Sequence, residues 1–563
     1  MSKEFYIQIR ERNLPEDLAE HWNKINYAGR ETLNWFLEGL SQISDRRLRP
    51  IISEVWEAQL SLSERLYIDA LRLSQILSEQ VVANERFNPQ RSVWFNPEMA
   101  KMIRRARDVF TPQTLVWQLD GIGLLRQRGG LKEVYNASNQ GIRGQFDGVI
   151  HDVLGSATSL NLGAEFPYVS IVSNLASQMG IGDNFCLPYH PGISQIFGAE
   201  FLSSLYPNQE KVYFFGESSG TAVNSAAIEA VCAYGEKVFP GKFPKVLQVD
   251  GTWCGGLGTA KEGTGFGVAS QAEKRGGARW VDRCLPLPTA ENRELFLKIV
   301  REKIEAGEAA GVFLEPIVGD AGIVPSDQQL VKELVRLLQE GVNGYSLPII
   351  VDTVQQGSGR TEEYWGIEHL SELTGYSHLV LTTAKSASNG QPFGFTLIPK
   401  SVAEKAYPLS MITTNSGNGG LLRAVTAAKF LQNPRIQSII DQNAAVIDEI
   451  TASYGMDLRG RRMNRGIETG SKELMEVIQW HLFIKYGILV GALPQTVRFQ
   501  PMLLEHPKTI RNITEATCRG IKEVLENVEL GQDGKIIHYN PNVIPKEVVI
   551  SCNSSGDPSG LNR

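Results

Sequence analysis

The stretch LPIIVDTVQQGSGRT, residues 347–361, begins as a short apolar strand and turns polar and glycine-rich directly after Asp352. A second apolar run, HLVLTT at residues 378–383, ends in the same way and is followed by Lys385. The spacing suits a βαβ unit, so we expect two parallel strands joined by a crossover helix. Since parallel strands end at one edge of a sheet, Asp352 and Lys385 are predicted to face one ligand crevice. A structural ion pair is the alternative.

Three further apolar segments have the length and β-branched composition of buried strands, with helical segments between them. They are KVYFFG (211–216), KVLQVD (245–250) and GVFLEP (311–316). The helical segment at residues 326–341 begins with Ser326 and Gln329, which we interpret as a capping box. Strands that alternate with helices are typical of a mostly parallel sheet covered on both faces.

The two ends of the chain have a different pattern. Apolar positions recur at helical spacing through residues 54–82, which predicts a helical N-terminal extension for packing or dimerisation. After about residue 411 the chain is again mainly helical. One strand pair is expected there, formed by GILVGAL (487–493) and QTVRFQP (495–501).

Composition excludes several classes of protein. The chain has 563 residues, 42% of them hydrophobic and 21% charged, so a sizeable buried core is expected. A net charge of −6 without long blocks of like charge argues against a nucleic-acid partner. Six scattered cysteines predict neither a metal site nor a disulfide framework, and a reducing cytoplasm fits best. The charged N-terminus and the lack of long apolar runs predict neither a secretion signal nor a membrane span.

Small residues precede a long amphipathic helix in GESSGTAVNSAAIEAVCAYGEKV, residues 216–238. Ser219, Gly220 and Thr221 stand where the helix begins. The first backbone N–H groups of a helix lack intrahelical partners and carry the positive end of its dipole, which favours an anion such as phosphate. An ordinary N-cap is the alternative, because Ser and Thr are among the commonest N-cap residues.

An aromatic residue, Trp253, follows the strand of KVLQVDGTWCGGLGTA, residues 245–260, on a glycine-rich turn. Its ring is predicted either to face the crevice or to lie in the core. An aromatic face, a phosphate turn, an acid and a lysine together fit pyridoxal phosphate, whose aldehyde forms a Schiff base with an amine. Opposite charge about 4 Å away is worth roughly 4 kcal/mol at an effective dielectric near 20, so Asp352 can keep the pyridine nitrogen protonated. Small neighbours give Lys385 room to move aside for a substrate amine.

The order of these motifs resembles the class III pyridoxal-phosphate-dependent aminotransferases, which are fold type I enzymes. The motifs are SSGTAVNSA, FLEPIVGDAG, VDTVQQGSGRT, TTAKSASNGQPFG, TTNSGNGG and VRFQP. The resemblance implies an α/β fold with a mainly parallel seven-stranded sheet in a large domain, a smaller α+β domain and a homodimer with shared active sites. The predicted parts are the helical extension (1–120), the N-terminal segment of the small domain with its lead-in (121–195), the large domain (196–410), the C-terminal small domain (411–540) and a polar tail (541–563). Disorder is predicted for the last part of the tail, SCNSSGDPSGLNR, residues 551–563.

The resemblance implies roles for residues around the cofactor ring. Lys385 is similar to the Schiff-base lysine and Asp352 to the aspartate at the ring nitrogen. Gln355 is similar to the residue beside the phenolic oxygen, and Trp253 to the stacking aromatic. The implied cofactor is therefore pyridoxal 5'-phosphate.

The resemblance also implies how phosphate and substrate are held. Gly220 and Thr221 match the phosphate-binding turn, and Thr414 resembles a threonine that reaches the phosphate from the partner subunit. Arg498 resembles the arginine that receives the substrate carboxylate. Glu315 resembles a glutamate that pairs with that arginine when the substrate has no carboxylate there.

Three residues depart from the family pattern. Ala222 and Thr353 stand where the family usually has an acidic residue, and Cys254 stands where a histidine commonly follows the stacking aromatic. These differences put substrate choice in doubt and leave the cofactor positions intact. Cys254 is predicted to be a small packing residue, with a reactive thiol as the alternative.

The implied activity is transfer of an amino group from an amino acid or amine to an oxo acid through a Schiff base on Lys385. A racemase, epimerase or decarboxylase of the same family is the alternative, since these reactions share their first step. A non-catalytic scaffold with the same fold is a further alternative. Tyr364 and Trp365 are predicted either to line the pocket or to lie in the core.

Overall fold

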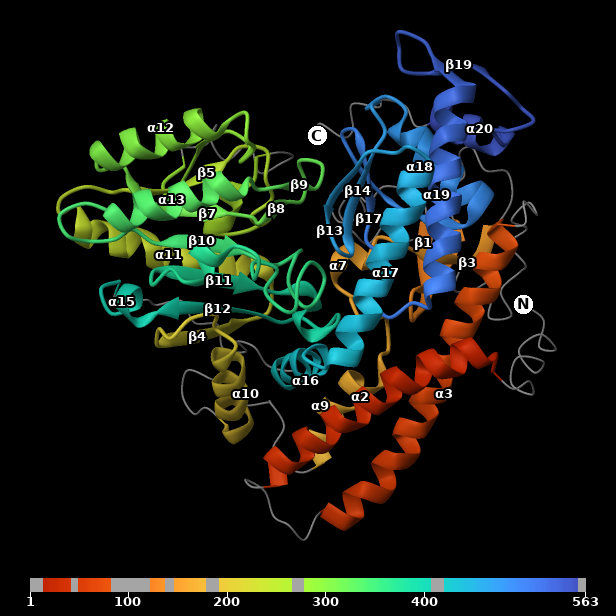
Figure 1. Cartoon of the computed structure of the whole chain (residues 1–563), viewed down its shortest axis with the longest axis horizontal. Helices are drawn as coiled ribbons and strands as arrows, with labels where there is room; N and C mark the ends of the chain where they lie inside the picture. The colour runs from red at the N-terminus through yellow and green to blue at the C-terminus, as the bar shows by residue number, and fades with distance from the viewer. Residues whose placement is uncertain are drawn as a thin grey trace. The chain divides into compact units, whose positions relative to one another are not determined.

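The computed structural model describes residues 14–41, 49–82, 122–136, 146–178, 192–265, 278–406 and 420–554. The chain forms two compact units (Figure 1). Unit 1 comprises Met1–Tyr27, Ser61–Pro167 and Ser438–Gly560, and unit 2 comprises Ala28–Leu60, Tyr168–Gln437 and Leu561–Arg563. The domain boundaries drawn from the sequence stay a prediction.

Unit 2 is built on a seven-stranded sheet. Its strands are β4 (Val212–Glu217), β5 (Lys245–Val249), β6 (Val281–Leu285), β7 (Ala309–Leu314), β10 (Ile349–Asp352), β11 (Leu379–Thr383) and β12 (Gly394–Pro399). The spatial order is β4-β12-β11-β10-β7-β5-β6, and only β12 runs antiparallel to its neighbours. The predicted mainly parallel seven-stranded sheet is confirmed. All five predicted segments are strands; the two strands that were not predicted are β12 and β6, an edge strand with partly exposed, polar positions.

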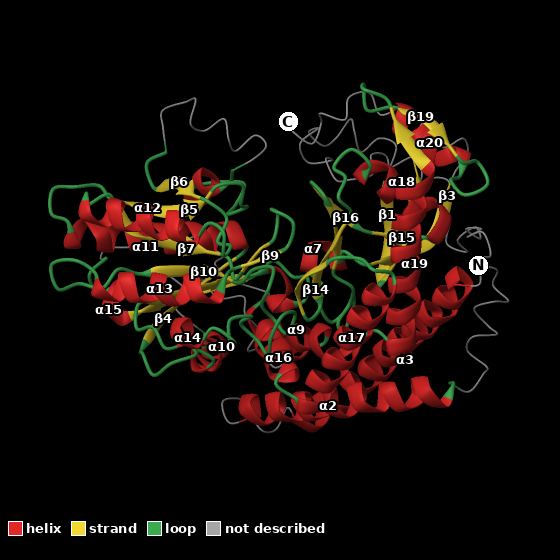
Figure 2. Ribbon diagram, turned by 45° about the horizontal axis from the view of Figure 1, so that its top comes forward, coloured by secondary structure: helices red, strands yellow, loops and turns green. Residues whose placement is uncertain are grey.

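Helices cover both faces of this sheet. α12 (Arg293–Glu305) and α13 (Gln328–Glu340) lie in front of the strands, whereas α11 (Gly220–Val238) lies behind them (Figures 1 and 2). α11 approaches closely because its inner face is small: a Cβ on Gly235 would lie 2.7 Å from the Cβ of Ala310 on β7. α13 buries Leu330, Leu334 and Leu338 at helical spacing. The predicted two-sided cover is confirmed.

The first turn of α13 differs from the prediction. Its N-cap is Asp327, whose side chain accepts a hydrogen bond from a backbone N–H three residues on, at 2.8 Å. The predicted capping box of Ser326 and Gln329 is therefore wrong. Ser326 Oγ instead donates to the carbonyl oxygen of Glu315 at 2.9 Å.

The crossover from β10 to β11 also differs from the prediction. Residues 353–370 form turns and bends, and only the short α14 (Ser371–Thr374) is helical. Gly359 and Gly366 have φ of 81° and 79°, in the left-handed region that a right-handed helix does not use. The predicted crossover helix is thus replaced by a largely buried loop that follows Asp352 directly.

Short elements complete unit 2. They are α8 (Pro167–Ser170), α9 (Val172–Gln178), α10 (Ile193–Ser204), η2 (Thr259–Gly263), β8 (Ile317–Val318), β9 (Val324–Pro325), η4 (Lys385–Ser388), α15 (Lys400–Ala403) and α16 (Leu421–Leu431). α16 packs against α10 and η4. A Cβ on Gly198 of α10 would lie 2.8 Å from Cγ of Leu421, which shows how closely α10 and α16 approach.

The N-terminal extension is helical where the structure describes it, in α2 (Glu16–Ser41) and α3 (Arg49–Val82). In unit 1, Trp22 of α2 packs against Tyr67 of α3 with ring centroids 6.1 Å apart. In unit 2, Trp35 of α2 packs against Phe201 of α10 at 4.9 Å. The extension therefore contributes to the core of each unit. None of the helices within the described ranges combines the length and apolar character needed to cross a bilayer.

Unit 1 contains two four-stranded sheets and several helices. The first sheet has the order β1-β2-β3-β15 and consists of β1 (Ile122–Arg128), β2 (Leu131–Asn136), β3 (Phe146–Asp152) and β15 (Ile488–Leu489). The second has the order β13-β14-β17-β16 and consists of β13 (Leu458–Arg461), β14 (Asn464–Glu468), β17 (Thr496–Phe499) and β16 (Gly491–Leu493). The helices are α7 (Gly155–Thr158), α17 (Pro434–Ser453; its first turn belongs to unit 2), α18 (Met475–Tyr486) and α19 (Pro507–Asn527). β16 and β17 form the antiparallel pair that the sequence predicts.

The end of the chain is more ordered than predicted. A hairpin of β18 (Val528–Leu530) and β19 (Ile536–Tyr539) is followed by α20 (Lys546–Ser554). The first four residues of the predicted disordered segment, residues 551–563, are thus helical, because they continue α20, which fully buried Val548 anchors. Residues 555–563 lie outside the described part.

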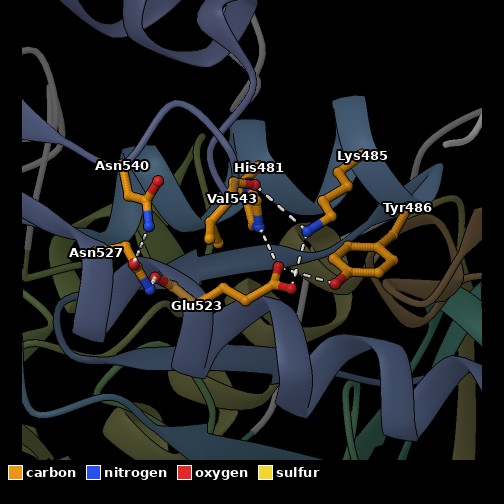
Figure 3. Close-up of polar contacts among 7 residues, drawn as sticks. All are labelled: His481, Lys485, Tyr486, Glu523, Asn527, Asn540 and Val543. Atoms are coloured by element: carbon orange, nitrogen blue, oxygen red, sulfur yellow. Dashed lines mark hydrogen bonds and ion pairs between the residues drawn. The ribbon is translucent and has the colours of Figure 1, made fainter. Parts of the chain in front are cut away.

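One carboxylate holds several elements of unit 1 together. Glu523 on α19 accepts hydrogen bonds from His481 Nε2 at 2.7 Å, Lys485 Nζ at 2.8 Å and Tyr486 OH at 2.8 Å, all from α18 (Figure 3). Lys485 Nζ also donates to the carbonyl oxygen of Val543 at 3.3 Å, beyond the hairpin. Burial raises the pKa of Glu523, but these hydrogen bonds outweigh burial and lower it to about 2.

Glu523→Gln is expected to lower the free energy of unfolding by about 2–3 kcal/mol at neutral pH, because an amide NH₂ would face donors in a half-buried site. Because the pKa of Glu523 is about 2 in the folded protein and 4.5 in the unfolded chain, the ionised carboxylate stabilises the fold fully above pH 4.5. This stabilisation is lost as the pH falls from 4.5 to about 2. The variant and the wild type should therefore converge below pH 4.5. Urea unfolding across pH 3–8 measures this, with the exposed Glu526→Gln on the same helix as control; equal stabilities of Glu523→Gln and wild type at pH 7 would contradict it.

Candidate active site

The predicted acid and lysine lie at the same edge of the sheet. Asp352 ends β10 and stands in parallel register with Thr382 of β11. Lys385 follows β11 after a single intervening residue and begins η4. Both therefore lie where the parallel strands end, as the sequence predicts.

Asp352 is fully buried and its carboxyl group is held by two donors. Oδ1 accepts from the backbone N–H of Val354 at 2.7 Å, and Oδ2 accepts from Asn224 Nδ2 of α11 at 2.7 Å. Burial raises the pKa of Asp352, the two hydrogen bonds and the charge of Lys385 lower it, and the charge of Asp320 raises it. Together these effects place the pKa at about 6. Two donors and the charge of Lys385 thus favour the carboxylate form of Asp352, in a site that water does not screen.

Lys385 occupies a strained turn among small, buried residues. Its φ is 49°, in the left-handed region that residues other than glycine rarely adopt. A Cβ on Gly394 of β12 would lie 2.8 Å from the Cβ of Ala384, so larger side chains do not fit beside the lysine. The small residues in this stretch are therefore required by close packing against β12.

The start of α11 packs against both strand ends. Ser219 is the N-cap, and its Oγ accepts from the backbone N–H of Ala222 at 3.3 Å. A Cβ on Gly220 would lie 3.2 Å from Val354 and 3.5 Å from Ala384. Ser219 thus fulfils the N-cap role, and the first N–H groups of α11 lie beside the residues that flank Asp352 and Lys385.

The loop after β5 carries the predicted aromatic. Trp253 is 42% exposed, which excludes it from the core of unit 2. The loop is held near the start of α11 because Gly256 N donates to Thr221 Oγ1 at 3.3 Å. Cys254 is fully buried, and burial followed by the charge of Asp352 raises the pKa of its thiol well above the usual value. This favours a packing role for Cys254 over a reactive thiolate.

Glu315 and Gln355 bring buried polar atoms to the same edge. Glu315 Oε2 accepts from Gly319 N at 3.2 Å, and a Cβ on Gly319 would lie 2.3 Å from Gln355 Oε1. Glu315 Oε1 and Gln355 Oε1 have no hydrogen-bond partner among the described residues. Burial raises the pKa of Glu315 well above its usual value, and the charges of Asp352 and Asp320 raise it further.

Two predicted residues are not part of the described portion of unit 2. Thr414 lies outside the described residues. Arg498 is buried on β17 of unit 1, opposite Gly466 and Gly491. A Cβ on Gly491 would lie 3.0 Å from the Cβ of Arg498, so glycine leaves space for the long side chain.

The aromatic pair in the crossover loop belongs to the core. Trp365 is 3% exposed, donates from Nε1 to the carbonyl oxygen of Leu205 at 2.6 Å and packs edge-on against Phe395. Tyr364 is 7% exposed and packs against Trp365. These contacts favour the core alternative for both.

Comparison with known protein families adds evidence independent of this geometry. The family Aminotransferase class-III matches residues 134–520, well over half of the chain. The chain belongs to the class-III aminotransferase family. Members of this family use pyridoxal phosphate, and the matched residues include all ten candidate site residues.

Relatives of this class-III chain include more than one activity. Acetylornithine aminotransferase of Prochlorococcus marinus subsp. pastoris is 28% identical over 306 residues, 52% of this chain and 70% of the relative. Leucine/methionine racemase of Thermococcus litoralis is 25% identical over 390 residues, 63% of this chain and 83% of the relative. The crystal structure of ornithine aminotransferase from Toxoplasma gondii shares the fold with a TM-score of 0.61 at 16% identity, covering 76% of this chain and 96% of that one. Family membership therefore establishes the fold but does not decide which reaction the chain catalyses, so that question depends on the residues of the site.

The class-III site of this chain fits the family's cofactor on three observations. The buried carboxylate of Asp352 is ionised at neutral pH and suits a protonated ring nitrogen. Gln355 Oε1 is buried without a hydrogen-bond partner among the described residues and suits a hydroxyl donor. Gly220 stands at the N-terminus of α11, the end of a helix that suits phosphate. Its lack of a Cβ leaves a space beside Val354 that a side chain would crowd.

Two polar residues near Asp352 in this class-III chain are not among those predicted from the sequence. Asn224 donates to Asp352, and Asp320 lies close enough for its charge to raise the pKa of Asp352 and Glu315. A signal existed for Asn224, because it is a polar residue on a largely apolar helix, one turn after Gly220. No comparable pattern points to Asp320, which lies in a turn.

Proposed function

We propose that this class-III protein is a pyridoxal-phosphate-dependent aminotransferase that moves an amino group from an amino acid or amine to an oxo acid. The observation that supports this best is the position of the buried, doubly hydrogen-bonded carboxyl of Asp352 at one sheet edge with Lys385 and the start of α11. When bound, the cofactor supplies an electron sink for the electrons released at the donor Cα.

Each residue of the site has a role in this proposal. Lys385 Nζ binds the cofactor aldehyde and, when released by the donor amine, accepts the Cα proton and later returns it. Asp352 holds the proton on the pyridine nitrogen by charge. Ser219, Gly220 and Thr221 bind the phosphate at the start of α11.

The remaining assignments rest on the family resemblance. Trp253 stacks on the ring, and Gln355 orients its phenolic oxygen. In a homodimer, Thr414 of the partner subunit completes the phosphate site, and Arg498 recognises a substrate carboxylate through bidentate hydrogen bonds. For Glu315, burial favours the neutral acid, which suits a hydrogen-bonding role in substrate selection more than a charged one.

A half-reaction screen tests the proposal. The purified protein, saturated with pyridoxal phosphate, is mixed with single amino donors without an acceptor, and bound cofactor is followed by absorbance as it converts to the pyridoxamine form. One equivalent of oxo product per site, and steady turnover only after an oxo acid is added, are expected. A protein that takes up no cofactor would refute the proposal.

A racemase is the second candidate, favoured by the likeness to the leucine/methionine racemase. It predicts interconversion of D and L amino acids without any acceptor and without accumulation of the pyridoxamine form. Chiral chromatography of the same donor reactions separates the two activities.

A further inference from the structure

We infer that Asn224 is a positioning residue that fixes the carboxylate of Asp352 and the Trp253 loop to each other through one amide group. The inference rests on the proposed function, because it concerns the acid that would face the cofactor ring. It assigns to the interior face of α11 a task beyond binding phosphate at its first turn.

The contacts of Asn224 define the orientation of its side chain. Asn224 is 2% exposed, and its Nδ2 donates to Asp352 Oδ2 at 2.7 Å and to the carbonyl oxygen of Cys254 at 2.9 Å. Both partners are acceptors, so the amide nitrogen must face them and a reversed amide would put oxygen against oxygen. The two hydrogens of one NH₂ group thus join β10 to the loop after β5.

The same face of α11 holds the rest of that loop. Three side chains at a spacing of four residues, Thr221, Ser225 and Glu229, lie on one face of the helix. Their loop partners are Gly256 N to Thr221 Oγ1 at 3.3 Å, Ala260 N to Ser225 Oγ at 3.1 Å, and Thr259 Oγ1 to Glu229 Oε1 at 2.6 Å. The loop that carries Trp253 is therefore fixed to the helix whose first turn is proposed to bind phosphate, and Asn224 connects this arrangement to Asp352.

The hydrogen bond from Asn224 is also one of the contacts that favour the charged form of Asp352. The titratable groups that face Asp352 are Lys385, Glu315, Asp320 and Cys254. Burial raises the pKa of Asp352, and the donors from Val354 and Asn224 oppose burial. Without Asn224 the carboxyl keeps one donor in a buried site, so it would take up a proton at higher pH.

Asn224→Ala is the direct test, in the full chain loaded with pyridoxal phosphate. We expect the acid limb of the turnover profile, and the matching change in the visible cofactor band, to move up by about one pH unit, the size expected for one hydrogen bond to a charged group. Turnover should fall by about tenfold on the acid limb, below both midpoints, and by only about twofold at pH 7, while the cofactor Kd stays close to the wild-type value. Asn224→Asp keeps the shape but places a second carboxylate beside Asp352, so its shift should be larger.

Ser225→Ala separates positioning of the acid from general loosening of the loop. It removes one loop bond and leaves the donor to Asp352, so the pH midpoint should stay at the wild-type value even where Trp fluorescence changes. Unfolding of each apo variant, followed by circular dichroism, identifies one that fails to fold, and Asn224→Ser then replaces it because serine keeps a small donor.

The possible outcomes are distinct. A wild-type protein that takes up no cofactor overturns the proposed function. A wild-type protein that binds cofactor, with Asn224→Ala and Asn224→Asp giving the wild-type pH profile and spectrum, overturns this inference alone. A pH shift of the same size in Ser225→Ala also overturns it, because the effect would then come from the loop.

Discussion

Lys385→Ala is expected to leave a folded protein that retains pyridoxal phosphate only weakly, shows no visible band from covalently attached cofactor and loses about 10³-fold or more in turnover. The lysine supplies both the covalent link and the base that moves the Cα proton, so no neighbouring group replaces it. Folding should be little affected, because alanine fits among the small buried residues on either side. Absorbance of dialysed protein, followed by borohydride reduction and peptide mapping, measures the attachment.

The left-handed backbone at Lys385 adds a second expectation. Alanine at φ 49° carries the same strain as lysine, so the variant should neither gain nor lose much stability from the turn itself. Lys298→Ala on α12, where the side chain is 69% exposed, is the matched control and should keep both the band and the activity. If reduced cofactor maps to another lysine, or the band persists in Lys385→Ala, the assignment is wrong.

The strand ends are predictable from sequence because buried parallel strands are continuous apolar runs. β10 and β11 are followed directly by polar residues, and that change from apolar to polar locates Asp352 and Lys385 at one edge of the sheet. The helix start at Gly220 follows from local chemistry in the same way. These signals are local in the chain, and the structure confirms the positions that they predict.

What the sequence does not show is decided by contacts between distant segments. Ser326 and Asp327 are both good N-caps, and Asp327 is also held by Arg293, whose Nε donates to Oδ1 at 2.8 Å from 34 residues away. Asn224 lies 128 residues before Asp352, so no spacing rule connects them. The crossover loop depends on glycines whose positive φ becomes visible only in the fold.

Asp352→Asn is expected to reduce turnover by roughly 10³-fold while the cofactor still binds. The attraction between the carboxylate and a protonated ring nitrogen is worth about 4 kcal/mol at an effective dielectric near 20, and each 1.36 kcal/mol is tenfold in rate. An amide in the same place has no net charge and leaves the ring nitrogen unprotonated. Single-turnover rates and cofactor titration measure the two effects separately, with Asp441→Asn on the exposed side of α17 as control.

The apo protein gives an independent test of the same residue. With a folded pKa raised by burial from 3.8 to about 6, Asp352 binds its proton more tightly in the folded state, so it lowers stability as pH rises from about 4 to 6, by about 3 kcal/mol in total. Asparagine does not titrate. The carboxylate accepts hydrogen bonds from Val354 N and Asn224 Nδ2, and the NH₂ group of asparagine would have to face one of these two donors. The unfolding free energy of Asp352→Asn should therefore lie below wild type at pH 4 and approach it by pH 7. A pH dependence identical to wild type would mean that Asp352 is not the buried acid described here, whatever the turnover.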